Sequence, residues 1–353
     1  MRKYLFTGVS GCGRIELLEE LKNELQKRGK TVTIIDIGSL IFEAANEVGT
    51  LISPKKILDL DHDLLVAFRK NAIQKAINIM DKNNSDFILI GIHATFRWRG
   101  RIIDGINFGD LKDLGVETVF NVVDDVKNIL EKNCNNKKYE DLPKPTPEET
   151  NYWIQEEELV SETLANIFGI PFYVIGRQSD IKNIADFFTS NKPRVYLSFP
   201  ITAIQKENPQ LLDQIQNQHL KELTNHFIVF NPMVIKDLEK KGEIEELTNE
   251  AAFGFSVRTV TRDYRFIDQS DFLVVIYLTE KASPGVLSEI IYASTHGKPV
   301  YMVYPFRKSP FLEEYTTKVF PDFPHMIKFL SSPEFKKINS RDSMDFGLFK
   351  PSH

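Results

Sequence analysis

The sequence has few cysteines and no long apolar run. Cys12 and Cys134 are its two cysteines among 353 residues, which excludes a disulfide framework and indicates a reducing compartment. No apolar run approaches the roughly 20 residues of a membrane span. The opening MRKYLFTGVSGCGR lacks the sustained apolar core and the cleavage site of a signal peptide. We therefore expect a cytoplasmic protein that makes no use of a membrane.

The sequence also lacks an excess of basic residues. Lys and Arg number 44 against 49 Asp and Glu, which gives a formal net charge of −5. This balance argues against dedicated nucleic-acid binding but leaves room for a small anionic ligand at a local site. Hydrophobic residues make up 42% and charged residues 26%, an ordinary globular composition. The length favours two domains.

Strands and helices alternate along the first half of the chain. Short apolar or β-branched runs predict strands at 4–7, 31–37, 87–92, 119–123 and 171–175. Apolar stripes predict helices at about 15–28, along 65–79 and up to 168, whereas the polar stretch 135–150 is interpreted as a mobile excursion. This alternation is typical of a mostly parallel sheet.

A second alternating pattern begins after a linker predicted at 190–193. Its predicted strands cover 194–199, 227–230, 272–278 and 299–304, and its helices cover about 209–224 and 283–296. The aromatic-rich tail beyond Phe306 receives no assignment from its pattern. The sequence therefore predicts an α/β protein with two separate domains.

A glycine-rich loop joins the first predicted strand to the first predicted helix. Gly8 and Gly13 have the spacing of a P-loop, with Gly11 between them, and the amides of such a loop point at an anion. A working P-loop continues with Lys and then Ser or Thr, whereas Arg14 and Ile15 follow here. Arg14 keeps the positive charge without the compact ammonium geometry, and Ile15 cannot ligate a metal.

Residues 1 to about 188 resemble an archaeal-type adenylate kinase. The resemblance rests on YLFTGVSGCGR, on IIDIGSLIFEAANEVG at 34–49 and on GIHATF at 91–96. It implies a P-loop kinase-like parallel-sheet domain over 1–189. Gly91 stands where the family has an acidic residue that supports Mg²⁺, and the lid segment 128–138 has no arginine.

These combined losses imply a domain that is inactive as a kinase. Two interpretations stay open: the domain binds a nucleotide through Gly8, Gly11, Gly13 and Arg14, or it is a structural or dimerisation scaffold. His93 could contact a nucleotide, although a lone His at a strand end is more often structural.

In the second half, the segment 261–303 carries the chemistry. A polar helix with Asp263 leads into a buried strand, after which a helix starts at Ser283, a favourable N-cap, with Pro284 at its first position. The amides of that first turn would form an anion pocket, and Glu289 follows within the helix. A carboxylate beside an anion pocket suits cleavage of a nucleotide N-glycosidic bond.

This half resembles the nucleoside 2-deoxyribosyltransferase superfamily and the related 2'-deoxynucleoside 5'-monophosphate N-glycosidases. The match covers about 194–305, and it rests on VYLSFP at 195–200, on Arg262-Asp263 before Ser270-Asp271, and on Ser283-x-Gly285-x-x-x-Glu289. Ser198 and Phe199 depart from the family, because they occupy its usual Gly region. The resemblance implies a flavodoxin/Rossmann-like domain, which we assign to 193–353.

The same resemblance implies a role for each matching residue. Glu289 matches the catalytic carboxylate, and Asp263 matches the acid that handles the base or the sugar hydroxyl. The implied substrate-binding residues are Tyr196, Ser198, Phe199, Pro200, Ser283, Gly285 and Val286. The transferases have Asp where Ser283 stands, whereas the monophosphate hydrolases have Ser, so a 5'-monophosphate substrate is favoured. The chemistry requires no metal or cofactor, and the family implies a homo-oligomer.

Simpler interpretations stay open for three of these residues. Glu289 could face solvent, Asp263 could form a surface ion pair with Arg262 or Arg265, and Tyr196 could fill the core instead of stacking on a base. For the whole protein, the expectation is cleavage or exchange of the N-glycosidic bond of a nucleotide, with a second nucleotide at the N-terminal loop. The alternatives are an NAD-glycohydrolase, a nucleotide kinase and a non-enzymatic nucleotide sensor.

Overall fold

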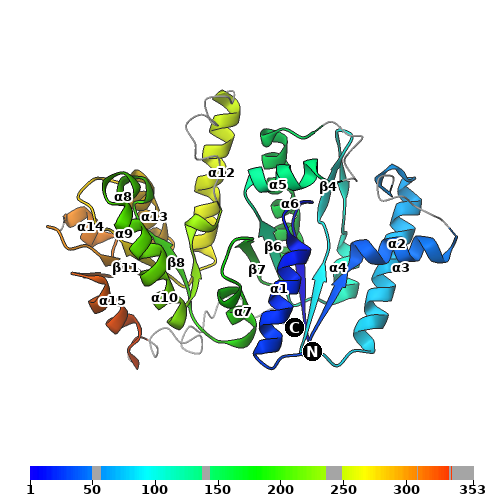
Figure 1. Ribbon diagram of the computed structural model, residues 1–353, viewed down its shortest axis with the longest axis horizontal. Helices are drawn as coiled ribbons and strands as arrows, with labels where there is room; N and C mark the ends of the chain where they lie inside the picture. The colour runs from blue at the N-terminus through cyan, green and yellow to red at the C-terminus, as the bar shows by residue number, and fades with distance from the viewer. Residues whose placement is uncertain (50–56, 137–143, 236–248, 308, 334, 336–353) are drawn as a thin grey trace. The chain divides into compact units, whose positions relative to one another are not determined.

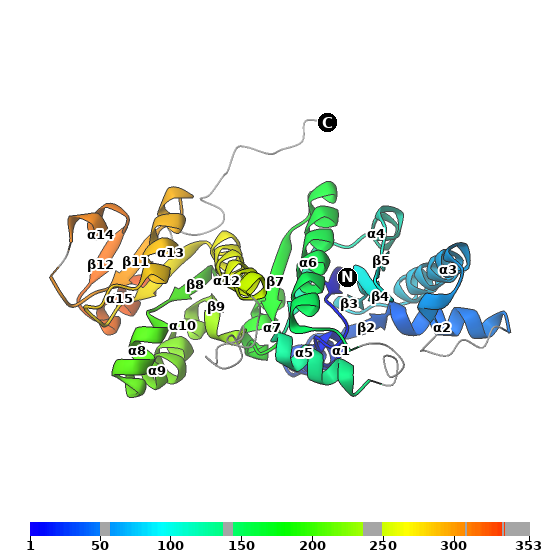
Figure 2. The ribbon, with the colours of Figure 1, turned by 90° about the horizontal axis from the view of Figure 1, so that it is seen from above.

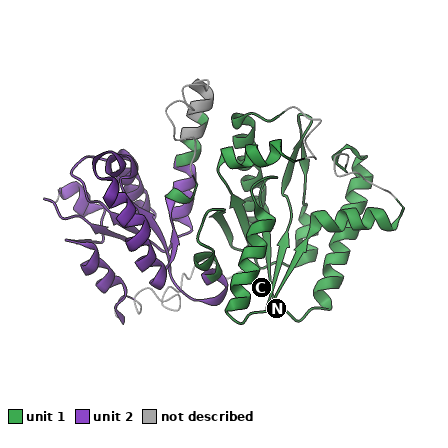
Figure 3. Cartoon of the chain, viewed as in Figure 1, with its two compact units in different colours: residues 1–185, 233–259 green, residues 186–232, 260–353 purple. Residues whose placement is uncertain are grey.

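The chain folds into two α/β units. The computed structural model describes residues 1–49, 57–136, 144–235, 249–307, 309–333 and 335. Figure 3 colours the two compact units: an N-terminal unit of 1–185 with 233–259, and a C-terminal unit of 186–232 with 260–353. Each contains a five-stranded sheet in which all neighbouring strands are parallel. The predicted α/β class with two parallel-sheet domains is confirmed.

The sheet of the N-terminal unit has the order β2-β3-β1-β6-β7 (Figure 1). Its strands are β1 (Arg2–Thr7), β2 (Val32–Asp36), β3 (Phe87–Gly91), β6 (Thr118–Val123) and β7 (Phe172–Gly176). Ile88, Leu89 and Ile90 are fully buried, because helices cover both faces of a parallel sheet and leave no polar side for the strand. The continuous apolar runs that predicted these strands follow from this burial.

Helices connect these strands across the sheet. They are α1 (Arg14–Lys27), α2 (Ile37–Glu47), α3 (His62–Asp81), α4 (Phe108–Leu114), α5 (Val126–Cys134), α6 (Pro147–Phe168) and α7 (Ile181–Thr189), with a 3-10 turn at Ile57–Asp59. One hydrophobic cluster joins α3, α4 and α6 to β3 and β6 on one face. The chain passes from β1 to β2 in one direction along the sheet, and from β2 through β3 and β6 to β7 in the other direction. Because crossovers between parallel strands are right-handed, α1 lies on the face opposite to α3, α4 and α6.

The predicted helical stripes are largely the buried faces of these helices. α1 buries the four leucines of its predicted stripe, Leu17, Leu18, Leu21 and Leu25. In α3 the stripe is buried except for Ile79, which is 38% exposed, so that residue lies outside the face that packs. α6 begins at Pro147 because the Thr146 side chain accepts the Glu149 N–H in a capping box. Part of the predicted excursion, 137–143, lies outside the described residues.

A hairpin that the sequence did not predict follows β3. Its antiparallel strands are β4 (Thr95–Trp98) and β5 (Arg101–Asp104). Arg99 and Gly100 form the turn with positive φ angles of 50° and 74°. Charged residues interrupt the apolar pattern in both strands, so their sequence carries no strand signal.

The sheet of the C-terminal unit has the order β12-β11-β10-β8-β9. Its strands are β8 (Arg194–Ser198), β9 (Ile228–Phe230), β10 (Phe272–Ile276), β11 (Val300–Val303) and β12 (Lys318–Phe320). The helices are α8 (Ile201–Glu207), α9 (Pro209–Gln214), α10 (Leu220–His226), α13 (Pro284–Thr295), α14 (Pro310–Glu314) and α15 (Phe323–Leu330). The helix α12 (Asn249–Asp268) contributes its residues 260–268 to this unit. Figure 2 shows α13 and the end of α12 on one face of this sheet, with α10 and α15 on the other.

Two features of this unit differ from the sequence prediction. The helix predicted at 209–224 contains a π turn, Ile215–His219, between α9 and α10. The tail that received no assignment contains α14, β12 and α15. β12 adds an edge strand beside β11, and α15 buries Met326 and Leu330 completely, so part of the tail belongs to the core.

Candidate functional site

The crevice at the carboxyl ends of β8 and β10 is where chain topology predicts a ligand in the C-terminal unit. The chain leaves β8 toward β9 and then crosses back to β10 on the other side of β8. Open α/β sheets bind ligands at such a switch point, outside the carboxyl ends of the strands. Ser198 ends β8, and α13 follows β10. These two elements bring the central residues of the candidate site together.

Glu289 projects from α13 toward β8. Its Oε1 accepts a hydrogen bond of 3.0 Å from the Tyr196 hydroxyl, and its Oε2 accepts one from the Ser198 hydroxyl. The neighbouring Ile290 is buried, whereas Ile291 is 44% exposed. Glu289 itself is partly buried, so its carboxyl group does not lie in bulk water, which was one of the simpler interpretations of the sequence.

The environment of Glu289 favours its protonated form. Burial raises the pKa of Glu289 to about 8, and the negative charge of Asp263 contributes in the same direction. The hydrogen bonds from Ser198 and Tyr196 and the charge of Arg262 act against this rise. A carboxyl group that changes its charge near pH 8, beside a second carboxylate, is typical of a functional site.

Asp263 lies on α12 and is paired with its neighbour in the chain. Its Oδ1 accepts hydrogen bonds from Arg262 Nε at 3.1 Å and Arg262 Nη2 at 3.0 Å. The Arg262 side chain is 8% exposed and that of Asp263 is 16% exposed. The ion pair expected with Arg262 is therefore present, but it lies mostly below the surface. Asp263 also lies close enough to Glu289 to raise its pKa.

Tyr196, Phe199 and Pro200 lie inside the C-terminal unit. Tyr196 has no exposed surface, and its ring centroid lies 6.4 Å from that of Phe266. Burial and the neighbouring Glu289 raise the pKa of Tyr196 well above its usual value, so the hydroxyl keeps the proton that it donates. The Tyr196 ring fills the core, as one of the two sequence interpretations had it. Phe199 and Pro200 are also buried, so they pack inside the unit and offer little surface to a substrate.

The first turn of α13 is where the sequence predicts an anion pocket. Ser283 occupies the N-cap position, but its side chain accepts no hydrogen bond from the turn, and its own N–H donates to the Tyr277 hydroxyl at 2.8 Å. Gly285 is exposed, and a Cβ added there would meet nothing within 4 Å. Val286 is buried. The amides of this turn have no partner within the helix, so the open space at Gly285 leaves room for an anion.

The glycine loop of the N-terminal unit follows β1. Gly11 and Gly13 have φ angles of 86° and 76°, a backbone conformation that favours glycine. Arg14 is 6% exposed and turns back on the loop, since its Nη1 donates to the Gly8 carbonyl at 2.9 Å and lies 3.2 Å from His93 Nδ1. His93 Nδ1 in turn lies 2.7 Å from the Gly8 carbonyl. Arg14 and His93 therefore stabilise the loop from inside.

Glu157 is a buried carboxylate that the sequence analysis missed. Its oxygens accept hydrogen bonds from the N–H groups of Gly8, Ala94 and Thr95 at 2.6–2.8 Å, and from the Thr95 hydroxyl at 2.8 Å. Burial raises the pKa of Glu157. This single side chain connects α6 to the glycine loop and to the hairpin. The first amide of the loop is consequently occupied by the protein itself.

Two cationic side chains that the sequence analysis also missed lie over the end of the glycine loop. A Cβ built on Gly13 would lie 2.8 Å from Arg177 Nε and 2.9 Å from Lys132 Nζ. Arg177 pairs with Glu20, and Lys132 lies 3.4 Å from Asp124. Neither residue has a sequence signal, because Arg177 follows β7 and Lys132 lies in the last turn of α5, both distant in sequence from the loop.

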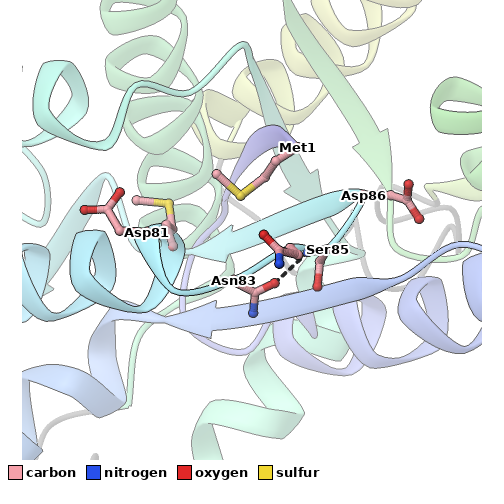
Figure 4. A pocket seen from close by; sticks show the side chains of 7 residues that line it. Met1, Asp81, Asn83, Ser85 and Asp86 are labelled. Atoms are coloured by element: carbon pink, nitrogen blue, oxygen red, sulfur yellow. Dashed lines mark hydrogen bonds between the residues drawn. The ribbon is translucent and has the colours of Figure 1, made fainter.

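A separate hollow lies at the opposite end of the N-terminal sheet (Figure 4). Its volume is about 420 Å³, and Met1, Met80, Asp81 and Asp86 are among the residues that line it. Asp86 accepts hydrogen bonds from the Thr31 backbone and hydroxyl, which lower its pKa. None of the residues predicted to form a functional site lines this hollow.

Among the residues that the structure describes, no group of three His, Cys, Asp or Glu side chains is placed to hold a metal ion. Within the same ranges, no helix has both the length and the apolar character needed to cross a membrane.

The first part of the chain matches the model of a known protein family. The model, described as an AAA domain, matches residues 7–149, and the N-terminal part is a P-loop kinase-like domain. Among solved structures, a 2-deoxyribosyltransferase from the psychrotolerant bacterium Bacillus psychrosaccharolyticus matches with a TM-score of 0.29 and 17% identity, covering 37% of this chain and 88% of that chain. A conserved protein from Enterococcus faecalis V583 matches with a TM-score of 0.23 and 18% identity, covering 39% and 87%.

Proposed function

We propose that the C-terminal domain, which the sequence predicts over 193–353, cleaves or exchanges the N-glycosidic bond of a nucleotide. The observation that carries this proposal is the Glu289 carboxyl group, which two hydroxyls from β8 hold at the switch point of the sheet. Glycosidic cleavage passes through a sugar with developing positive charge, and a fixed carboxylate is the group that meets this charge or attacks the sugar carbon. Glu289 has that role in the proposal.

Asp263 and the first turn of α13 complete the proposed mechanism. Asp263 assists at the base or at a sugar hydroxyl, and its hydrogen bonds with Arg262 keep its carboxylate in place. The free amides near Gly285 hold the 5'-phosphate, because a helix N-terminus stabilises negative charge. Ser283 adds a neutral hydroxyl that tolerates this phosphate, which favours a nucleoside monophosphate over a nucleoside.

The state of Glu289 sets the pH at which the reaction runs. The proposed role needs the ionised carboxylate, whereas a pKa of about 8 leaves the protonated form in excess at neutral pH. We therefore expect kcat/KM to rise with pH through pH 8 and to level off above it. A fixed, dehydrated carboxylate is a stronger nucleophile and a better partner for a cation than one surrounded by water.

Product analysis tests the proposal. The full chain is incubated with deoxynucleoside and ribonucleoside monophosphates, nucleosides, ATP with AMP, and NAD, and the products are separated by liquid chromatography. Free base from a nucleotide supports the proposal. Nicotinamide points to NAD cleavage, ADP points to phosphoryl transfer, and unchanged compounds throughout contradict an enzymatic role for Glu289.

A second candidate function, nucleotide binding at the glycine loop, is favoured by Lys132 and Arg177. Their cationic groups lie over Gly13, where they can balance the charge of a phosphate. Arg14 is not directed at that phosphate, because its guanidinium donates to the Gly8 carbonyl. Calorimetric titration of ADP into the full chain in EDTA tests this function. Binding that weakens about 10-fold or more in a K132A/R177A double variant supports it, because two phosphate contacts are lost, and equal binding contradicts it.

A further inference from the structure

The two oxygens of the Glu289 carboxyl group are held separately by two hydroxyls on one strand. Tyr196 and Ser198 are two residues apart on β8, so both side chains project from the same face of the sheet. Tyr196 binds Oε1, and Ser198 binds Oε2. Both hydroxyl residues have no exposed surface. The carboxyl group is therefore fixed at two points rather than one.

The contact of Ser198 differs from the role that the sequence suggested for it. A serine hydroxyl has one proton to donate, and here that proton is directed at Glu289. A fully buried side chain also has no surface with which to contact a substrate. Its position at the end of β8 lets it act on the substrate only through the carboxyl group that it holds.

We propose that Ser198 is a positioning residue, which fixes the plane of the Glu289 carboxylate for attack on the sugar carbon. This inference rests on the proposed function. The hydroxyl also stabilises the ionised carboxylate, because a hydrogen bond to a charged acceptor is stronger than one to a neutral acceptor. With Tyr196 alone, the carboxyl group can rotate about its remaining contact.

Removal of the hydroxyl has a signature that distinguishes positioning from substrate binding. In Ser198→Ala we expect kcat to fall about 10- to 100-fold, because a displacement of about 1 Å at the reacting group costs up to about 100-fold. KM should stay within about threefold, since the hydroxyl does not contact the substrate. The lower limb of the pH profile should move to higher pH, because the Ser198 hydrogen bond lowers the pKa of Glu289.

A matched control and a rescue variant complete the experiment. Ser270 is also buried in this unit, but its hydroxyl donates to the Phe266 carbonyl at 2.6 Å at the other end of β10. Ser270→Ala should therefore leave the pH profile of the wild type unchanged. Ser198→Thr keeps a hydroxyl and should recover activity relative to Ser198→Ala. An unchanged kcat in Ser198→Ala, or a rise in KM with an unchanged pH profile, overturns the inference.

A measurement without substrate separates this inference from the proposed function. Unfolding of the wild type, Ser198→Ala and Ser270→Ala is followed by circular dichroism between pH 5 and pH 9. Destabilisation by Ser198→Ala that grows toward pH 9 supports the hydrogen bond to the ionised carboxylate, and pH-independent destabilisation overturns it. If the wild type releases no base from any nucleotide, the proposed function fails and the positioning role fails with it, whatever the unfolding curves show about the contact.

Discussion

The raised pKa of Glu289 makes the stability of the C-terminal unit depend on pH. The unfolded chain releases the Glu289 proton near pH 4.5, whereas the folded protein keeps it up to about pH 8. Between these values the folded state binds more protons than the unfolded state. The free energy of unfolding therefore falls as pH rises through this window, by at most about 1.4 kcal/mol per pH unit.

Glu289→Gln removes this dependence. Glutamine is close in shape to the protonated acid, and it can keep one hydrogen bond to each of Tyr196 and Ser198, because a hydroxyl also accepts. The rise from 4.5 to about 8 sets an upper limit of about 5 kcal/mol at 1.36 kcal/mol per pKa unit. Glu289 is only partly buried, and solvent screening reduces the expected gain of the variant between pH 5 and pH 9 to about 3 kcal/mol.

The assay must report on the correct unit. Trp98 and Trp153 are the two tryptophans, and both lie in the N-terminal unit, so their fluorescence follows that unit alone. Circular dichroism follows both units, and the transition without a fluorescence counterpart belongs to the C-terminal unit. Urea unfolding at pH 5, 7 and 9 then compares the wild type, Glu289→Gln and the control Glu280→Gln, which changes an exposed glutamate in the loop before α13.

The comparison has a clear outcome in either direction. We expect Glu289→Gln to gain stability relative to the wild type as pH rises, while Glu280→Gln follows the wild type at each pH. If the free energies of unfolding of Glu289→Gln and the wild type stay parallel from pH 5 to pH 9, the carboxyl group of Glu289 is not dehydrated and its pKa is not raised.

Three further predictions concern the residues around the two sites. Glu157→Ala should destabilise the N-terminal unit by about 3 kcal/mol, because it leaves several buried donors without an acceptor; tryptophan fluorescence in urea measures this, and a loss below about 1 kcal/mol contradicts the role. Asp263→Asn should lower the pKa of Glu289, because it removes a neighbouring negative charge. The lower limb of the kcat/KM profile should then move to lower pH, and a movement to higher pH would contradict this effect of Asp263. Gly285→Ala should leave unfolding unchanged, because its Cβ meets nothing within 4 Å, yet raise KM for a monophosphate more than for the matching nucleoside; equal effects on both argue against a phosphate at that turn.

The sequence predicted the elements of both sheets better than the contacts between their side chains. Long apolar runs such as Phe272–Ile276 identify strands, because burial on both faces leaves a continuous signal. β12 and the hairpin β4–β5 have three and four residues per strand with charges among them, so no such signal exists. Their place depends on neighbouring strands that are distant along the chain.

In the candidate sites too, local patterns identified single residues but not their contacts with residues distant along the chain. Spacing within one segment led to Glu289, but the contact with Ser198 joins residues 91 positions apart, which no local pattern reveals. The charge of Arg14 suggested a phosphate contact, whereas the fold turns its guanidinium onto the Gly8 carbonyl. For Glu157 a signal was present, because it lies at helical spacing between the buried residues Trp153 and Ser161, and a carboxylate on the buried face of a helix needs donors.

If the carboxyl group of Glu289 carries the cleavage of a nucleotide N-glycosidic bond, its removal must slow the release of base under single-turnover conditions. The wild type, Glu289→Gln and Glu280→Gln are each mixed in excess with the nucleotide from which the wild type releases base, at pH 8.5, where the carboxylate is ionised. We predict that Glu280→Gln releases base at the rate of the wild type and that Glu289→Gln is slower by about 1000-fold or more, as expected when a group that acts in the transition state is lost. Base release by Glu289→Gln at the rate of the wild type would contradict the account.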